Sequence, residues 1–177
     1  MSVAFTWGTA EAERRLPFPC DTYVPQADAV YFRGITVRAP RERLFRWLCQ
    51  MRVAPYSYDW IDNRGRRSPR TLTPSLEHLA IGQSMMGVFT IVDFAGDRHI
   101  TLRIKQGTGA FSLFGDLALT YLVMEESPES CRLLVKMVVR YPRGITGAVM
   151  RRVLPWGDLL MMRRQLLNFK ALAEGEG

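Results

Sequence analysis

The sequence has no stretch that approaches the roughly 20 uncharged apolar residues needed to span a bilayer. Its first residues also lack the basic segment followed by an apolar segment that marks a secretory signal. We therefore expect a cytoplasmic protein without integral membrane association. The length of 177 residues, of which 47% are hydrophobic and 23% charged, is typical of one compact domain.

Cysteine and histidine are both scarce. The three cysteines, Cys20, Cys49 and Cys131, are odd in number and far apart, so the sequence indicates neither a disulfide framework nor a zinc site. We expect them to be small buried hydrophobic residues. The two histidines, His78 and His99, lack the spacing of metal ligands, and no phosphate loop, dinucleotide fingerprint or serine-nucleophile motif is present. The sequence thus predicts no metal and no cofactor.

Lysine is also rare, although the chain is basic. The net charge is +7, and because only three of the 24 basic residues are lysine, 21 are arginine. The arginines are spread along the chain, and the densest group, at positions 64–70, is interleaved with glycine, serine and proline, which is typical of a solvated loop. We do not expect nucleic-acid binding, which usually depends on a concentrated basic surface.

Hydrophobic periodicity divides the chain into strands and helices. Alternation predicts strands at 30–37, 84–94, 98–105, 117–126 and 131–141, with short turns that favour antiparallel hairpins. Gly34 suggests a bulge in the first strand. A helix is expected after Pro40. A second helix should follow Pro142 and Gly144, interrupted at Pro155 and Gly157, with an apolar stripe at Leu159, Met162, Leu166, Phe169 and Ala173.

Residues 1–29 contain three prolines and should be mostly irregular. Apolar residues such as Trp7, Phe18 and Tyr23 are frequent enough for this segment to pack on a domain surface, unlike a disordered tail. We predict an N-terminal extension over 1–29, packed on a domain that covers 30–177.

The most distinctive motif is the aromatic and acidic run at 56–63. Tyr56, Tyr58 and Trp60 offer large apolar surfaces, and Asp59 adds a carboxylate, which is the composition of a small-molecule pocket wall. Asp59 could also cap a short helix, and the sequence does not decide between these roles. Tyr56, Tyr58, Asp59 and Trp60 are therefore our first candidate ligand-binding residues.

Four further residues are candidates with ordinary alternatives. His99 could act in proton transfer, although a structural histidine in a strand is the simpler interpretation. Arg103 could bind an acidic ligand group, or it could face solvent beside acidic cross-strand partners. Phe111 and Phe114 lie among glycines in a loop that could cover a cavity or tuck its aromatic rings onto the core.

The order of predicted elements indicates an α+β fold, and the chain resembles the START-like superfamily, also called SRPBCC or polyketide cyclase/dehydrase-like. The resemblance covers residues 30–173 and implies a helix-grip fold, in which a curved antiparallel sheet wraps around a long C-terminal helix. It also implies a cavity between sheet and helix for a hydrophobic molecule. The residues that carry it are those at 35–40 with Leu44, Trp47 and Leu48, and the segments 56–63, 79–83, 92–94, 99–102 and 162–166.

Three functions are compatible with these observations. The first is binding of a hydrophobic or aromatic small molecule in the internal cavity. The second is an enzyme of cyclase or dehydratase type, in which Asp59 or His99 moves a proton and Arg103 or a tyrosine stabilises enolate charge. The third is a protein-interaction module, which requires an exposed stripe of Leu159, Met162 and Leu166 on the terminal helix.

Overall fold

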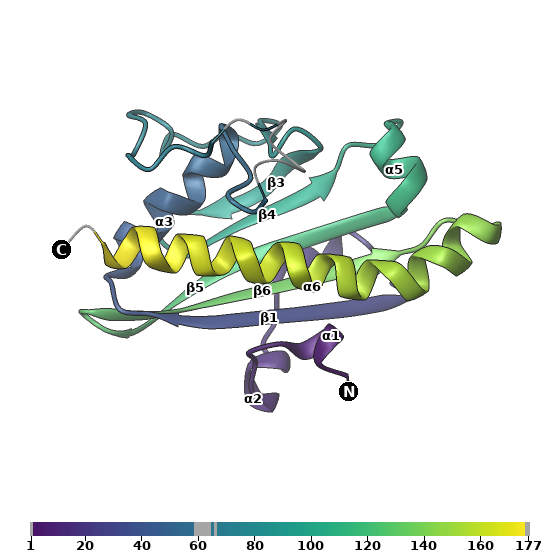
Figure 1. Cartoon of the computed structure of the whole chain (residues 1–177), viewed down its shortest axis with the longest axis horizontal. Helices are drawn as coiled ribbons and strands as arrows, with labels where there is room; N and C mark the ends of the chain where they lie inside the picture. Colours follow the sequence, from purple (N-terminus) through teal and green to yellow (C-terminus); the bar gives the residue numbers. More distant parts are fainter. Residues whose placement is uncertain (1, 59–64, 66, 176–177) are drawn as a thin grey trace.

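The computed structural model describes residues 2–58, 65 and 67–175, and it shows a curved sheet crossed on one face by a long helix (Figure 1). The sheet is antiparallel, with six strands in the order β1-β6-β5-β4-β3-β2. This is the predicted α+β helix-grip fold. The strands are β1 (Ala29–Val37), β2 (Ser84–Met85), β3 (Phe89–Ala95), β4 (His99–Ile104), β5 (Asp116–Ser127) and β6 (Ser130–Arg140).

Two helices cover the inner face of the sheet. The 31-residue α6 (Gly144–Glu174) runs across the strands, and α3 (Arg41–Cys49) packs beside it, followed by the short 3₁₀ helix η2 (Gln50–Arg52). Because side chains alternate along a strand, Ile100, Leu102 and Ile104 of β4 all point into the core under these helices, where each is almost fully buried. Met162, Leu166, Phe169 and Ala173 of the predicted α6 stripe lie in the same core, so the inner face holds the main hydrophobic cluster. Leu159, the remaining stripe residue, is also buried.

The N-terminal segment covers the edge strand β1 and the outer face of the sheet. It forms α1 (Val3–Thr6), α2 (Glu11–Arg14) and the 3₁₀ helix η1 (Pro19–Thr22), of which α1 and α2 lie beside β1 in Figure 1. Phe18, Cys20 and Val24 are buried against outer-face residues of three strands. The outer-face residues that they contact are Phe32, Ala118, Leu134 and Val138. The N-terminal segment thus packs on the sheet, while its division from a domain at 30–177 stays a prediction.

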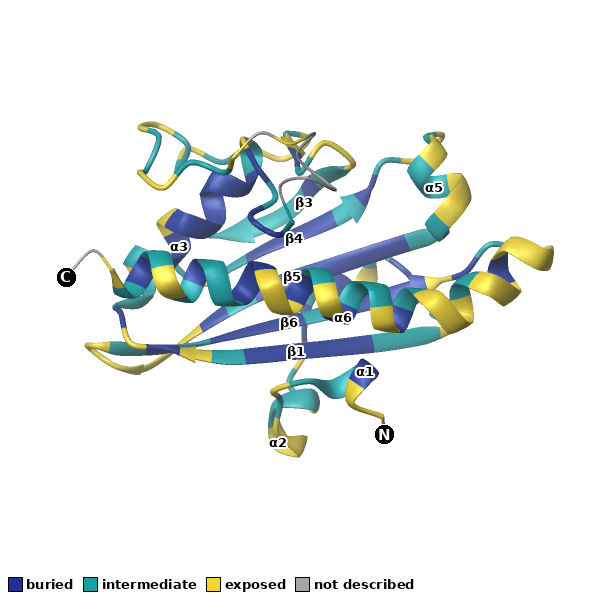
Figure 2. Ribbon diagram, in the orientation of Figure 1, coloured by how far each residue is buried: buried dark blue, intermediate teal, exposed yellow. Residues whose placement is uncertain are grey.

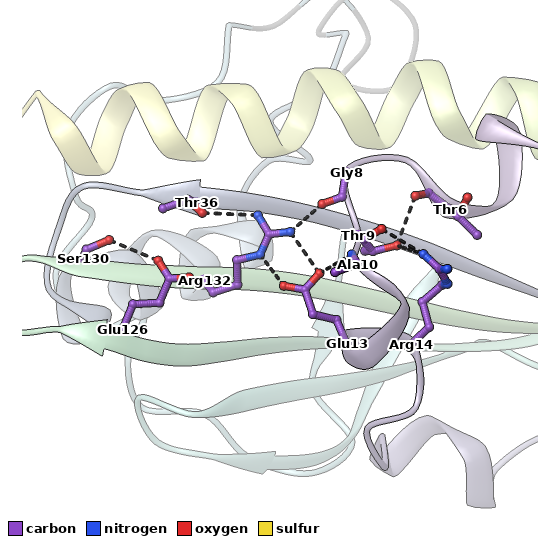
Figure 3. A network of polar contacts seen from close by, with 10 residues as sticks. All are labelled: Thr6, Gly8, Thr9, Ala10, Glu13, Arg14, Thr36, Glu126, Ser130 and Arg132. Atoms are coloured by element: carbon purple, nitrogen blue, oxygen red, sulfur yellow. Dashed lines mark hydrogen bonds and ion pairs between the residues drawn. The ribbon is translucent and has the colours of Figure 1, made fainter.

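A polar network fastens this segment to β6 (Figure 3). Arg132 donates from Nε to Glu13 at 2.6 Å and from Nη2 to the other Glu13 oxygen at 3.1 Å. The same guanidinium donates to the carbonyl of Gly8 and to the Thr36 hydroxyl. The hydrogen bond from Arg132 is the main cause that lowers the pKa of Glu13. Because the pair is mostly shielded, it fixes the position of α2 on the sheet.

Gly34 allows the N-terminal segment to pass close to β1, and the prediction of a bulge at this residue is wrong. The pairing of β1 with β6 runs without a shift from Ala29 to Val37. The Gly34 amide donates to the Trp7 carbonyl at 3.1 Å, and a Cβ at Gly34 would lie 2.9 Å from the Gly8 oxygen. Glycine is required because the N-terminal segment crosses the strand at this point.

Three other predictions are corrected. The strand predicted at 84–94 is two strands, because Met86 and Gly87 take positive φ and turn the chain between β2 and β3. The connection after β4 contains a helix, α5 (Gly109–Phe114), whose N-cap Thr108 accepts the Phe111 amide. The terminal helix continues through Pro155, which is buried, so packing on the sheet outweighs the loss of one helical hydrogen bond.

Candidate functional site: a small cavity under the terminal helix

A cavity of about 140 Å³ lies between the sheet and α6. Leu119 and Tyr121 of β5 form its floor, because both have the parity that points to the inner face. Its roof comes from α6 residues spaced three and four apart, which share one helix face. Most of the wall is apolar and rich in methionine. The lining residues are Pro55, Ser57, Met86, Phe89, Leu119, Tyr121, Met137, Asp158, Met161, Met162 and Gln165.

Two polar side chains at this cavity are held by hydrogen bonds. The Tyr121 hydroxyl donates to Gln165 Oε1 at 2.6 Å, and Gln165 Nε2 donates to the Pro55 carbonyl at 2.6 Å. Burial raises the pKa of the Tyr121 phenol, so it stays a neutral hydrogen-bond donor over the physiological range. This chain of bonds connects β5, α6 and the segment after η2, and it fixes the shape of the cavity at one end.

A carboxylate at the cavity is paired with a buried arginine. Arg33 Nη2 lies 2.6 Å from Asp158 Oδ2, and their side chains are 1% and 12% exposed. Arg33 also donates to the carbonyls of Phe32 and Ala4, both at 2.9 Å. Burial raises the pKa of Asp158, and the neighbouring Arg33 opposes this rise. Asp158 therefore brings an ionisable oxygen group to a mostly apolar wall.

An open groove of about 690 Å³ adjoins this region along the C-terminal half of α6. Ser57 belongs to both the groove and the cavity, so the segment around it forms a wall that the two share. The groove is polar and basic where the cavity is apolar. Its described lining residues are Tyr56, Ser57, Tyr58, Arg67, Ser68, Pro69, Arg70, Arg164, Asn168, Ala171 and Leu172.

The predicted aromatic wall is divided between core and groove. Tyr56 has positive φ and is 1% exposed, and its ring centroid lies 6.2 Å from that of Trp47 and 5.2 Å from that of Phe169. Its ring is therefore part of the core, while its carbonyl accepts from Asn168 Nδ2 at 2.7 Å. Tyr58 is partly exposed and lines the groove. Asp59 and Trp60 lie outside the described residues.

His99 and Arg103 lie on the outer face of the sheet, opposite the cavity. Both alternate with Ile100 and Leu102, which point to the inner core. His99 Nε2 lies 2.9 Å from Asp93 Oδ2, and Arg103 makes a two-pronged contact with Asp116 at 3.1 and 2.8 Å. These two residues thus have local acidic partners, and neither is brought to the cavity.

The two phenylalanines of the glycine-rich segment lie on α5. Phe111 and Phe114 are partly buried and pack against the main core, and α5 contacts α6. Of the two alternatives for this segment, aromatic rings tucked onto the core describe the observed packing. Neither ring lines the cavity between the sheet and α6.

Sequence reasoning missed the polar residues that meet at the cavity. Arg33, Tyr121, Asp158 and Gln165 come from two strands and one helix that are far apart in the chain. The sequence contains a signal that could have identified two of these residues. Arg33 is a charge at an inward position of an apolar strand, and Asp158 is the sole acidic residue between Pro142 and Ala173.

The cysteines match their prediction. All three are free and buried, and burial raises the pKa of Cys20 and Cys131 to about 11 and that of Cys49 to about 12. Such thiols stay protonated near neutral pH, so they act as packing groups. Within the described part of the chain, no cluster of metal-ligating side chains occurs, and no helix is both long and apolar enough to cross a membrane.

Solved structures with the same arrangement identify the fold. A START superfamily protein of Mycobacterium smegmatis superposes with a TM-score of 0.51 at 14% identity, over 84% of this chain and 99% of that one. The chain has the START-like fold. A protein of Chromobacterium violaceum (TM-score 0.52, 13% identity, 82% and 96% of the two chains) and one of Mesorhizobium loti (0.51, 11%, 84% and 98%) share this START-like fold.

No protein-family model matches the sequence, and no curated protein is significantly similar to it. At such low identities the structural similarity concerns the START-like fold and carries no ligand or reaction with it. Any function must therefore be argued from the cavity itself.

Proposed function

We propose that this protein binds a small apolar or aromatic molecule in the cavity between the sheet and α6. The observation that carries the proposal is a methionine-rich apolar wall with a few fixed polar groups, which is the usual composition of small-molecule sites. Apolar burial would supply most of the affinity. Asp158 and Gln165 would orient a ligand that carries a hydroxyl or amine group.

The size of the cavity limits the ligand. Drug-sized sites have volumes of roughly 300–1,000 Å³, whereas this cavity, which is partly open, has a volume of about 140 Å³. An engineered apolar cavity of about 150 Å³ accepts benzene. We therefore propose a ligand part of about one aromatic ring. Of the two residues predicted to move a proton in a cyclase- or dehydratase-type reaction, His99 lies on the opposite face of the sheet from the cavity, and Asp59 lies outside the described residues.

A single-ring probe tests the proposal. Toluene at ten times its dissociation constant should stabilise the protein by about 1.4 kcal/mol, which corresponds to a rise of roughly 3–6 °C in melting temperature for a domain of this size. Leu119→Phe places a ring in the cavity and should weaken toluene binding at least ~10-fold, because the space is then filled. Binding is measured by thermal denaturation and by NMR chemical-shift changes.

The matched control is Leu122→Phe, the same change on the same strand but on the outer face, where Leu122 is partly buried. This variant should bind toluene like the unmodified protein. If toluene changes neither melting temperature nor NMR spectrum, or if both variants bind it equally well, the cavity is not the binding site.

A further inference from the structure

The outward face of the first half of α6 carries a continuous apolar stripe. Its five residues are spaced four, four, three and four apart, so at 100° per residue they fall within an arc of about 80°. All are well exposed, from 46% for Val149 to 85% for Ile145. The first turns of α6 extend beyond the ends of the strands, where Figure 2 shows mostly exposed surface. The stripe consists of Ile145, Val149, Val153, Trp156 and Leu160.

This stripe is not the one that the sequence pattern suggested for a protein partner. Leu159, Met162 and Leu166 are 8%, 8% and 0% exposed, and Met162 and Leu166 belong to the main core. The interaction-module hypothesis in that form is therefore wrong. The centre of the exposed stripe lies about 120° around the same helix from the buried stripe. Exposed apolar residues in a continuous row are typical of a binding surface.

The exposed charges of this helical segment are basic. Between Pro142 and Ala173 the chain has six basic residues and one acidic residue, Asp158, which turns inward to Arg33. Arg143, Arg152 and Arg164 are exposed and form no ion pair with the described residues. On a helical projection, Arg152 and Arg164 flank the stripe on opposite sides.

These features identify the partner by its chemistry. A second copy of the chain would oppose arginines with arginines, and a nucleic acid would leave the apolar stripe without a contact. An anionic bilayer matches both the apolar stripe and the arginines, because apolar side chains enter the acyl boundary while guanidinium groups contact lipid phosphates. We propose that the protein docks reversibly on anionic membrane surfaces through the exposed stripe of α6, with the helix lying in the plane of the interface.

Vesicle sedimentation of the full-length protein tests this proposal. We expect binding to vesicles of 70% phosphatidylcholine and 30% phosphatidylglycerol at 150 mM NaCl, with a blue shift of tryptophan emission, and at least ~10-fold weaker binding to pure phosphatidylcholine, because several arginines each attract anionic lipid. Raising NaCl to 500 mM should weaken the binding further. Absence of binding to the anionic vesicles, or equal binding to both kinds, overturns the proposal.

Two sets of variants separate the stripe from the charges. Val153→Asp and Trp156→Asp, made separately, should each reduce the partition coefficient at least ~10-fold, because each puts a carboxylate into the apolar interface. The triple change Arg143→Gln, Arg152→Gln and Arg164→Gln should reduce it roughly 100-fold, since each arginine near an anionic surface contributes about fivefold. Unchanged melting temperatures verify that these surface variants fold.

Ile81→Asp is the matched control. Ile81 is 62% exposed, like the stripe residues, but it precedes β2 at the other edge of the sheet, and its substitution should leave vesicle binding unchanged. An equal loss with Ile81→Asp contradicts the assignment to α6. The membrane proposal is also overturned if sedimentation velocity finds a dimer that the stripe variants dissociate, while the vesicles bind no protein. The stripe would then bind a second copy of the chain.

Discussion

A chain that lacks residues 2–26 is expected not to fold. These residues supply Phe18, Cys20 and Val24, which bury the outer-face cluster of the sheet. Loss of the Phe18 ring alone should cost about 3–5 kcal/mol, and the total stability of a domain is about 5–15 kcal/mol. Removal of the whole segment would also leave Arg132 and Lys136 without Glu13 and Asp21. Circular dichroism should show that the truncated chain no longer unfolds cooperatively, and size-exclusion chromatography should show that it aggregates.

Point variants in the full-length chain calibrate this result. Phe18→Ala should lower the free energy of unfolding by about 3–5 kcal/mol, because the ring is 3% exposed and packs edge-on against Phe32. Leu16→Ala, in the same segment but only partly buried, should cost clearly less. A truncated chain that unfolds cooperatively at the unchanged melting temperature would show that residues 2–26 are a dispensable extension.

Arg33→Met is expected to destabilise the protein by about 3–5 kcal/mol at pH 7, because removing one partner of a buried ion pair leaves the other charge uncompensated. For a domain of this size the loss corresponds to roughly 6–20 °C in melting temperature. Arg33 is 1% exposed and bonds to the Ala4 carbonyl as well as to Asp158, so the change also weakens the hold on α1. Thermal and urea denaturation measure the effect.

The loss in Arg33→Met should depend on pH with a definite sign. Burial already raises the pKa of Asp158, and Arg33 opposes that rise, so the pKa in the folded variant must lie higher still. The folded state then binds the Asp158 proton more tightly than the unfolded state does. Stability of the variant therefore falls as pH rises through the folded pKa, and the loss relative to the unmodified protein shrinks toward pH 4–5.

The double variant Arg33→Met with Asp158→Leu removes both charges. It should recover most of the lost stability and lose this pH dependence, since apolar replacements of a buried pair are often neutral or stabilising. The surface change Arg46→Met is the control, because its pair with Glu77 is half exposed and such pairs contribute about 0–1 kcal/mol. A loss in Arg33→Met that does not change between pH 5 and pH 8 would contradict the assigned role of Asp158.

Local sequence patterns were sufficient for most of the fold. Alternation along β4, β5 and β6 predicted those strands to within one or two residues, since a buried face imposes period two on every strand. The helical stripe of α6 was predicted for the same reason. Two of the errors fall where one residue type has two uses: Pro155 lies within an unbroken helix, and Gly34 allows close approach of Gly8 rather than a bulge.

The candidate site was less predictable. The aromatic run at 56–63 stood out in the sequence, yet the Tyr56 ring is buried in the core, and Tyr58 is the partly exposed aromatic residue among those described that line the groove. A strand pattern gives the parity of its residues but not which face meets the helix. The sequence could therefore show that His99 and Arg103 lie on the same face of the sheet. Only the packed structure shows that this face is opposite the cavity.

The sequence by itself determined the α+β class, the positions of most strands along the chain and the amphipathic terminal helix, because these depend on the period of apolar residues along short segments. Only the tertiary structure decided where the cavity lies and which polar groups reach it. Arg33 and Asp158 are 125 positions apart, and Tyr121 and Gln165 are 44 apart. Such pairs form when the sheet curves around α6, and no local pattern records that contact.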